Sequence, residues 1–511
     1  MSINKIHLSE PVGGKNSAYF KTEHLKSDLG ARTIRGSAVT IVTQGVKFVI
    51  GMVGTVILAR LLTPQDYGLI GMVAVIIGFV SIFKDLGLSS ATIQRAEINS
   101  VQISTLFWVN IALSLAVMLV CFGIAPLISV FYHEPRLRLI TAAYGFGFML
   151  SGLTVQHEAL LRRQMRFTAL AVTEITALCA SVATAVGLAL YGAGYWALVA
   201  SQLSLGLVYL IGIWSLCRWR PGLPGRNSGV RSMLAFGRNL TGFAVINYFA
   251  RNLDNLLIGK VWGSQQLGLY AKAYQLLLLP IDQINSPIGA VALPALSRLS
   301  DSPEKYRQAY LRIMEKVAIL TMPGIALMIA TSDWIVLIVL GPQWSEAAWI
   351  FALLGVAGLL QPIASTAGWL FISQNRTKDM FRWGCFASSI IVVAIVAGLR
   401  WGAVGVACSY SATFLVVIMP LLFWFVGRVG PVRTLDFYRT IAPAALAALS
   451  VLIEIFLGRR YLVIKNPIVG VTTSFFAASL TTLLVLMTLA SGRRALWDFI
   501  RSAALLINRD K

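Results

Sequence analysis

Long apolar stretches follow one another along this chain, and they constrain its fold more than any other feature. Residues 104–130, for example, run without a single charged side chain. About 20 apolar residues are enough for a helix to cross the hydrocarbon core of a bilayer. Strands of a membrane barrel need only about 10 residues and alternate polar with apolar side chains, which these stretches do not do. The pattern therefore predicts an all-α polytopic membrane protein.

The composition supports this fold class. The chain has 511 residues, of which 57% are apolar and 13% charged, whereas a soluble domain carries roughly 25% charged residues. Cutting the apolar stretches at charged residues and at clusters of proline and glycine gives about 14 transmembrane helices. The five cysteines are widely separated and have no nearby histidine pair. We interpret them as packing residues and predict no metal site.

Basic residues indicate the orientation of the chain. The formal charge of +22 is distributed among the loops and forms no basic tail, so we predict no nucleic-acid partner. With both termini placed in the cytoplasm, most Lys and Arg residues fall in inside loops, as the positive-inside rule requires. Arg459, Arg460 and Lys465 lie in the last outside loop and break this rule. The orientation of the last helix pair is therefore left open.

Two motifs recur along the chain. Residues 60–69 align with 260–269, where Gln, Gly and Leu repeat, and residues 191–197 align with 401–407. Duplicated halves are common in transporters. We predict two pseudo-symmetric six-helix bundles, related by a two-fold axis along the membrane normal with a cavity between them, and an additional C-terminal helix pair. A carrier of this plan can work as a monomer.

This organisation divides the chain into six segments. We expect a cytoplasmic N-terminal tail, an N-terminal six-helix lobe, a basic cytoplasmic linker, a C-terminal six-helix lobe, an additional pair formed by helices 13 and 14, and a cytoplasmic C-terminal tail. Their expected ranges are 1–35, 36–216, 217–231, 232–427, 428–490 and 491–511, respectively.

Three motifs carry a family resemblance. They occupy residues 58–68 (LARLLTPQDYG), 84–95 (KDLGLSSATIQR) and 160–167 (LLRRQMRF). In this order they resemble the Wzx-like polysaccharide transporter branch of the MOP flippase superfamily, which includes the exopolysaccharide and colanic-acid flippases. The likeness covers nearly the whole chain after residue 35. It implies a MATE/MOP-like fold in the bacterial inner (cytoplasmic) membrane.

The resemblance also implies a substrate and partners. Such a protein moves an undecaprenyl-pyrophosphate-linked oligosaccharide repeat unit from the inner to the outer leaflet, for exopolysaccharide, capsule or lipopolysaccharide biosynthesis. A polysaccharide polymerase and a chain-length regulator are the partners it implies. No cofactor is expected.

Ionisable residues inside the predicted helices are the candidate site residues, because charges within a bilayer are costly and usually functional. A carrier of a pyrophosphate-linked glycan needs cations in a hydrophilic cavity. On helical spacing, polar residues share one face in the first, seventh and eighth predicted helices. The predicted cavity cations are Lys47, Arg251 and Lys272, and the predicted polar wall residues are Gln44, Asn247, Asn255 and Gln275.

Carboxylates in the same helices are candidates for ion or proton coupling, since a low-dielectric cavity favours protonation. They are Asp254, Asp282, Glu174 and Asp85. Structural alternatives stand beside these roles. Arg251 and Asp254 have the spacing of an i, i+3 ion pair, Lys47 and Lys272 can snorkel toward an interface, and Asp85 can cap a helix.

Other function classes remain as alternatives. A membrane glycan polymerase or ligase needs a large catalytic loop, yet the sequence has no Asp-x-Asp pair, no HExxH and no P-loop. We therefore predict no enzyme and no catalytic residues. A multidrug/cation antiporter of the same superfamily and a lipid II flippase share the architecture, and the residues alone do not separate them from a polysaccharide flippase.

Overall fold

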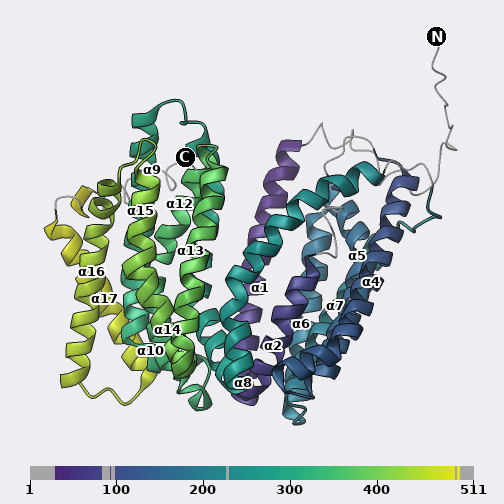
Figure 1. Cartoon of the computed structure of the whole chain (residues 1–511), viewed down its shortest axis with the longest axis horizontal. Helices are drawn as coiled ribbons and strands as arrows, with labels where there is room; N and C mark the ends of the chain where they lie inside the picture. Colours follow the sequence, from purple (N-terminus) through teal and green to yellow (C-terminus); the bar gives the residue numbers. More distant parts are fainter. Residues whose placement is uncertain (1–28, 83–91, 94–97, 226–229, 490–491, 495–511) are drawn as a thin grey trace. The chain divides into compact units, whose positions relative to one another are not determined.

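The computed structural model describes the chain except for residues 1–28, 83–91, 94–97, 226–229, 490–491 and 495–511 (Figure 1). The secondary structure of this described part is helical and contains no strand. It includes twelve helical segments that are long and apolar enough to cross a membrane. Two of the twelve, Arg251–Ser297 and Thr377–Gly427, are unusually long. The all-α membrane architecture is confirmed.

The two longest segments each contain a sharp break. In α8 (Val230–Ser297) the break is at Gly263, which has φ 79°. The Tyr270 hydroxyl donates to Asp254 on the other side of this break, although 16 residues of straight helix would separate them by about 24 Å. Gly402, with φ 71°, starts α14 (Gly402–Thr413), which packs back against α13 (Thr377–Gly398). Counting each as two helices agrees with the predicted number of about 14.

The first compact unit comprises Met1–Leu62 and Met72–Asn252. Its helices pack in pairs, α4 on α5, α6 on α7, α5 on α7 and α1 on α6 (Figure 1). A hydrophobic core includes Phe107, Cys217 and Trp219, and the ring of His157 stacks on that of Trp214 at 4.4 Å. The helices are α1 (Leu29–Leu61), the second part of α2 (Pro64–Ser81), α4 (Ser100–Tyr132), α5 (Leu137–Arg163), α6 (Phe167–Leu190), α7 (Tyr195–Leu216) and the first part of α8.

The second unit comprises Thr63–Gly71 and Leu253–Lys511. Its core is formed where α16 packs on α9 and includes Tyr306, Tyr310 and Phe437. Besides part of α8, the helices are α9 (Pro303–Ala330), α10 (Ser332–Val339), η3 (Pro342–Trp344), α11 (Ala347–Gly358), α12 (Gln361–Ser373), α13, η4 (Leu399–Trp401), α14, η5 (Phe414–Ile418), α15 (Met419–Gly427), α16 (Thr434–Tyr461) and α17 (Pro467–Thr488).

The repeated motifs pack against each other within the second unit. A Cβ atom on Gly68 would collide with the carbonyl oxygen of Ser264, and one on Gly268 would collide with the carbonyl oxygen of Pro64. The contact is reciprocal, because Gly68 corresponds to Gly268 and Pro64 to Ser264 in the alignment of the motifs. A two-fold related contact has this property. The glycines recur because the backbones touch here.

A second structural repeat escaped the sequence analysis. The turns after α5 and α12 both read Gln-x-Arg, at 164–166 and 374–376. Their central residues, Met165 and Asn375, have φ 53° and 55°. In each turn the arginine N–H donates to a carbonyl five residues earlier, at 2.9 Å for Arg166 and 2.7 Å for Arg376. Two identical residues were too weak a signal to detect without the backbone geometry.

Candidate functional site

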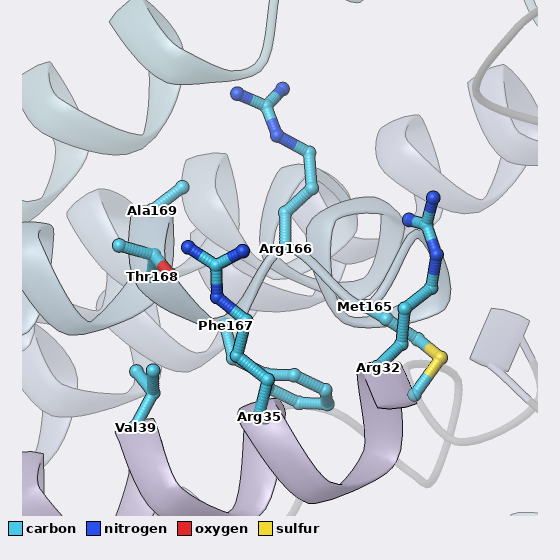
Figure 2. Close-up of a pocket in the computed structure, with 9 residues that line it drawn as sticks. Arg32, Arg35, Val39, Met165, Arg166, Phe167, Thr168 and Ala169 are labelled. Atoms are coloured by element: carbon cyan, nitrogen blue, oxygen red, sulfur yellow. The ribbon is translucent and has the colours of Figure 1, made fainter. Parts of the chain in front are cut away.

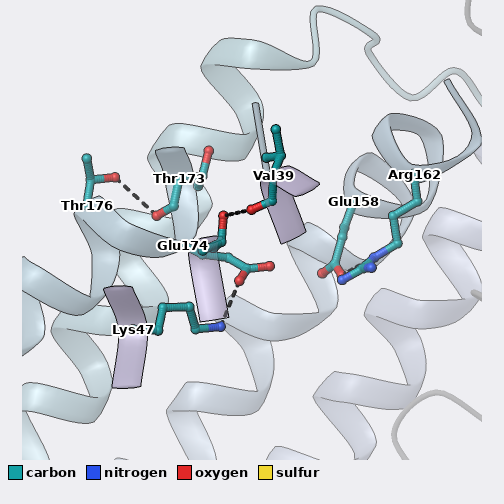
Figure 3. A network of polar contacts seen from close by, with 8 residues as sticks. Val39, Lys47, Glu158, Arg162, Thr173, Glu174 and Thr176 are labelled. Carbon is teal, nitrogen blue, oxygen red and sulfur yellow. Dashed lines mark hydrogen bonds and ion pairs between the residues drawn. The ribbon is translucent and has the colours of Figure 1, made fainter. Parts of the chain in front are cut away.

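An ion pair joins two helices of the first unit in the middle of their apolar sequences. The Lys47 Nζ of α1 lies 2.7 Å from the Glu174 carboxylate of α6, and the side chains are 32% and 22% exposed (Figure 3). Gly54, on the same face of α1, lets α6 approach, since a Cβ there would lie 3.0 Å from Val182. The polar stripe predicted on α1 therefore contains a residue that binds α6.

A second ion pair lies near the first. On α5 the Arg162 guanidinium donates to Glu158 at 2.8 Å, one helical turn away (Figure 3). The Tyr209 hydroxyl of α7 also interacts with Glu158. This pair was not among the predicted site residues. The i, i+4 spacing of Glu158 and Arg162 is a signal that could have found it.

In the second unit, the break in α8 builds a polar site around Asp254. This carboxylate is buried and accepts two hydrogen bonds, one from the Tyr270 hydroxyl at 2.9 Å and one from the Asn255 N–H at 2.8 Å. Without Gly263 the two arms of α8 would not meet. The sequence predicted Asp254 and Asn255 on a polar face but did not predict Tyr270 as a partner of the carboxylate.

Three more polar side chains lie in the same unit and form a chain of hydrogen bonds. The Gln361 amide of α12 donates to the hydroxyls of Tyr274 and Tyr410, at 3.1 Å each. The ring of Tyr274 is 6.2 Å from the ring of Tyr270. Gln361 and Tyr410 were not among the predicted site residues. Hydrogen bonds between helices satisfy polar groups that water does not reach inside a bilayer.

Lys272 is held within the second unit. Its Nζ lies 4.1 Å from the centre of the Tyr67 ring and donates to the Gln275 side chain at 3.0 Å. A lysine over a tyrosine face is stabilised by the ring quadrupole. The structure thus joins two predicted residues, Lys272 and Gln275, and adds Tyr67 from the recurring motif.

The other predicted site residues are exposed or lie outside the described part of the structure. The side chains of Gln44, Arg251 and Asp282 are exposed. Asp85 and the side chain of Asn247 lie outside the described residues. The roles assigned to all these residues remain predictions.

Two further arginines are engaged in pairs between helices. Arg307 of α9 donates twice to Asp436 of α16, at 2.8 and 2.6 Å. Arg459, which broke the positive-inside pattern, lies 2.6 Å from Asp333 of α10. Burial by itself would raise the pKa of Asp333, but the Arg459 guanidinium lowers that pKa below its ordinary value. The positive charge of Arg459 is therefore balanced locally.

Polar pairs inside long apolar helices define a multi-pass membrane protein. Comparison with solved structures agrees. The fold is similar to that of the lipid II flippase MurJ in an inward closed conformation, with a TM-score of 0.68 and 14% identity over 88% of this chain and 98% of that one.

The family follows from the sequence comparisons. The polysaccharide biosynthesis protein family model matches residues 57–349, which is more than half of the chain. The chain is 27% identical to the lipopolysaccharide biosynthesis protein WzxC of Escherichia coli, over 78% of this chain and 81% of that protein. It is 24% identical to the succinoglycan biosynthesis transport protein ExoT of Rhizobium meliloti, over 90% and 93%. The chain belongs to the polysaccharide biosynthesis protein family, and the resemblance read from its motifs is confirmed.

Proposed function

We propose that this protein is a flippase that moves an undecaprenyl-pyrophosphate-linked oligosaccharide from the inner to the outer leaflet of a bacterial cytoplasmic membrane. One observation carries the proposal: a member of a polysaccharide biosynthesis family keeps ionisable side chains partnered inside its apolar helices. The apolar polyprenyl chain of such a substrate can stay in the hydrocarbon core of the bilayer. The pyrophosphate and the glycan attached to it need polar groups along their route across the membrane.

Three cations are assigned to the anionic part of the substrate. Lys47 exchanges its bond to Glu174 for a bond to the pyrophosphate, and Lys272 lies over Tyr67 with its ammonium group oriented by Gln275. Arg251 is exposed on α8, where a guanidinium can bind phosphate oxygens in bidentate fashion. Release of Lys47 leaves the Glu174 carboxylate available for the ion-coupling role predicted from the sequence.

The experiment is a clean deletion, with secreted polysaccharide and lipid-linked oligosaccharide measured in the same cells. We expect loss of polymer and accumulation of one completed repeat unit on the polyprenyl carrier, with both effects reversed by the wild-type gene. Identifying the accumulated glycan gives the substrate. The result is independent of any single residue assignment.

Two other outcomes would overturn the proposal. If polymer and lipid-linked pools are unchanged while sensitivity to cationic drugs rises, the protein is a drug antiporter of the same fold. If single repeat units accumulate but are already accessible from outside the cell, the block lies in polymerisation and the protein does not transport them.

A further inference from the structure

A basic pocket lies at the start of α1, beside the turn between α5 and α6. Its volume is about 590 Å³, and Arg32 and Arg35 from α1 and Arg166 from the turn line it (Figure 2). All three side chains are exposed, and the Arg166 guanidinium also donates to the Leu216 carbonyl at 3.2 Å. Within the described part of the chain, the lining residues include no carboxylate. Three positively charged side chains therefore line one volume within the first unit.

A second pocket adjoins the basic one. It has a volume of about 300 Å³ and shares Gly36, Met165 and Phe167 with the basic pocket. Ile41 and the uncharged residues Thr33, Ser37 and Thr40 complete its described lining. Gly36 is required by this arrangement, because a Cβ there would lie 2.5 Å from the Phe167 ring. A ligand with an anionic head and an apolar chain can place one group in each pocket, whereas a free anion would occupy only the first.

In the second half of the chain, the arginine of the equivalent turn forms an ion pair. Arg376 is the counterpart of Arg166 in the repeated Gln-x-Arg turn. It is bound by Asp379 at 3.1 Å, in the first turn of the next helix. The position equivalent to Asp379 in the first half is Ala169, which lines the basic pocket. The first half thus lacks the carboxylate that neutralises the arginine in the second half.

From these observations we infer that the pocket of Arg32, Arg35 and Arg166 binds the phosphate group of a membrane lipid, with the start of the lipid chain along Phe167. Three guanidinium groups suit a diphosphate, since each can donate two parallel hydrogen bonds to phosphate oxygens. That this phosphate group comes from a polyprenyl diphosphate is an inference that rests on the proposed function. A glycerophospholipid headgroup offers the same chemistry. Arg32 and Arg35 belong to the stretch expected as a tail, but α1 extends to Leu29 and presents them from a helix.

The test is native mass spectrometry of the full-length protein in detergent, with undecaprenyl diphosphate, phosphatidylglycerol or undecaprenol added at equal concentrations. We expect undecaprenyl diphosphate to bind with one more molecule per chain than undecaprenol, which has no phosphate. The triple variant Arg32→Gln/Arg35→Gln/Arg166→Gln should lose that one molecule. Its apparent affinity should fall roughly tenfold or more, as expected when several charged hydrogen bonds to a ligand are removed.

Two matched controls isolate the pocket. The variant Arg298→Gln/Lys305→Gln/Arg439→Gln removes the same charge from exposed residues elsewhere and should bind like the wild type. Ala169→Asp should reproduce the loss of binding, because its carboxylate would neutralise Arg166 as Asp379 neutralises Arg376. Ala169→Asn, which has similar size and no charge, should retain the bound lipid.

The outcomes are separable. Loss of both undecaprenyl diphosphate and phosphatidylglycerol in the triple variant, at similar affinities, supports the site and assigns it to membrane lipids in general. Preference for undecaprenyl diphosphate supports the site and assigns it to the carrier lipid. Wild-type binding by the triple variant, or equal binding of undecaprenol, would overturn the inference. Because this assay needs no export, it can succeed even if the deletion experiment refutes the proposed function.

Discussion

The Lys47–Glu174 pair gives a prediction whose magnitude follows from its geometry. The atoms are 2.7 Å apart, and the side chains are 32% and 22% exposed. Hydrogen bonds to charged groups contribute about 1.5–3 kcal/mol, and removing one partner of a buried pair costs about 3–5 kcal/mol. Because both side chains are only partly buried, we expect Lys47→Met or Glu174→Gln to lower the free energy of unfolding by about 2 kcal/mol each.

The double variant distinguishes a real pair from two independent contacts. With both charges removed no unpaired ion is left, so we expect a loss close to that of one single variant, and a coupling energy of about 1–2 kcal/mol. Unfolding by sodium dodecyl sulfate in mixed micelles, followed by tryptophan fluorescence, measures these differences. The more exposed Glu158–Arg162 pair serves as control, with a coupling of about 0.5 kcal/mol or less.

Two results would refute this reasoning. Additive single losses, with no measurable coupling, would mean that Lys47 and Glu174 do not pair in the membrane. Single losses below about 0.5 kcal/mol would mean that both groups are well solvated. The exchange Lys47→Glu/Glu174→Lys adds a functional readout. If it restores stability but not export, the position of the cation matters for transport as well as for folding.

Three further predictions concern other contacts. Gly68→Ala or Gly268→Ala should destabilise the protein by about 1–3 kcal/mol or more, because each methyl group would meet backbone atoms; wild-type melting of both variants would show that the motifs do not touch. Arg251→Ala should abolish export at nearly normal abundance and Arg251→Lys should restore it only in part; loss of the protein from the membrane would instead identify a structural residue. The pKa of Asp333 lies below its ordinary value, so the stability contributed by its pair with Arg459 should be complete at neutral pH and lost as the pH falls through that lowered pKa. An Asp333→Asn variant whose free energy of unfolding is lower than that of the wild type by the same amount at pH 7 and at about pH 3 would contradict this sign.

The fold class was predictable because it depends on a property that the sequence shows directly. Long apolar stretches require helices in a bilayer, whatever their neighbours are. The recurrence of Gly68 as Gly268 was also visible, and the structure supplies its cause, a reciprocal backbone contact. The breaks at Gly263 and Gly402 are shown by the positive φ angles of these residues.

The partners of the candidate site residues were less predictable. Helical spacing placed Lys47 on a polar face, but it does not say which helix lies opposite, so Glu174 was predicted for a separate role. Tyr270 is far from Asp254 along the chain, and only the fold of α8 brings them together. The basic pocket was missed because its arginines come from two segments, one of them expected as a tail. Side-chain pairs between helices depend on packing, which one sequence does not reveal.

The central claim is transport of a lipid-linked oligosaccharide, and topology of the substrate tests it most directly. Spheroplasts in which the gene can be switched off would be pulse-labelled in the sugar and treated with a membrane-impermeant glycosidase while polymerisation is blocked. The account predicts that labelled lipid-linked oligosaccharide is cleaved when the protein is present and protected when it is depleted, at equal total amounts. Equal cleavage in both cases would contradict it, because the substrate would then reach the outer leaflet without this protein.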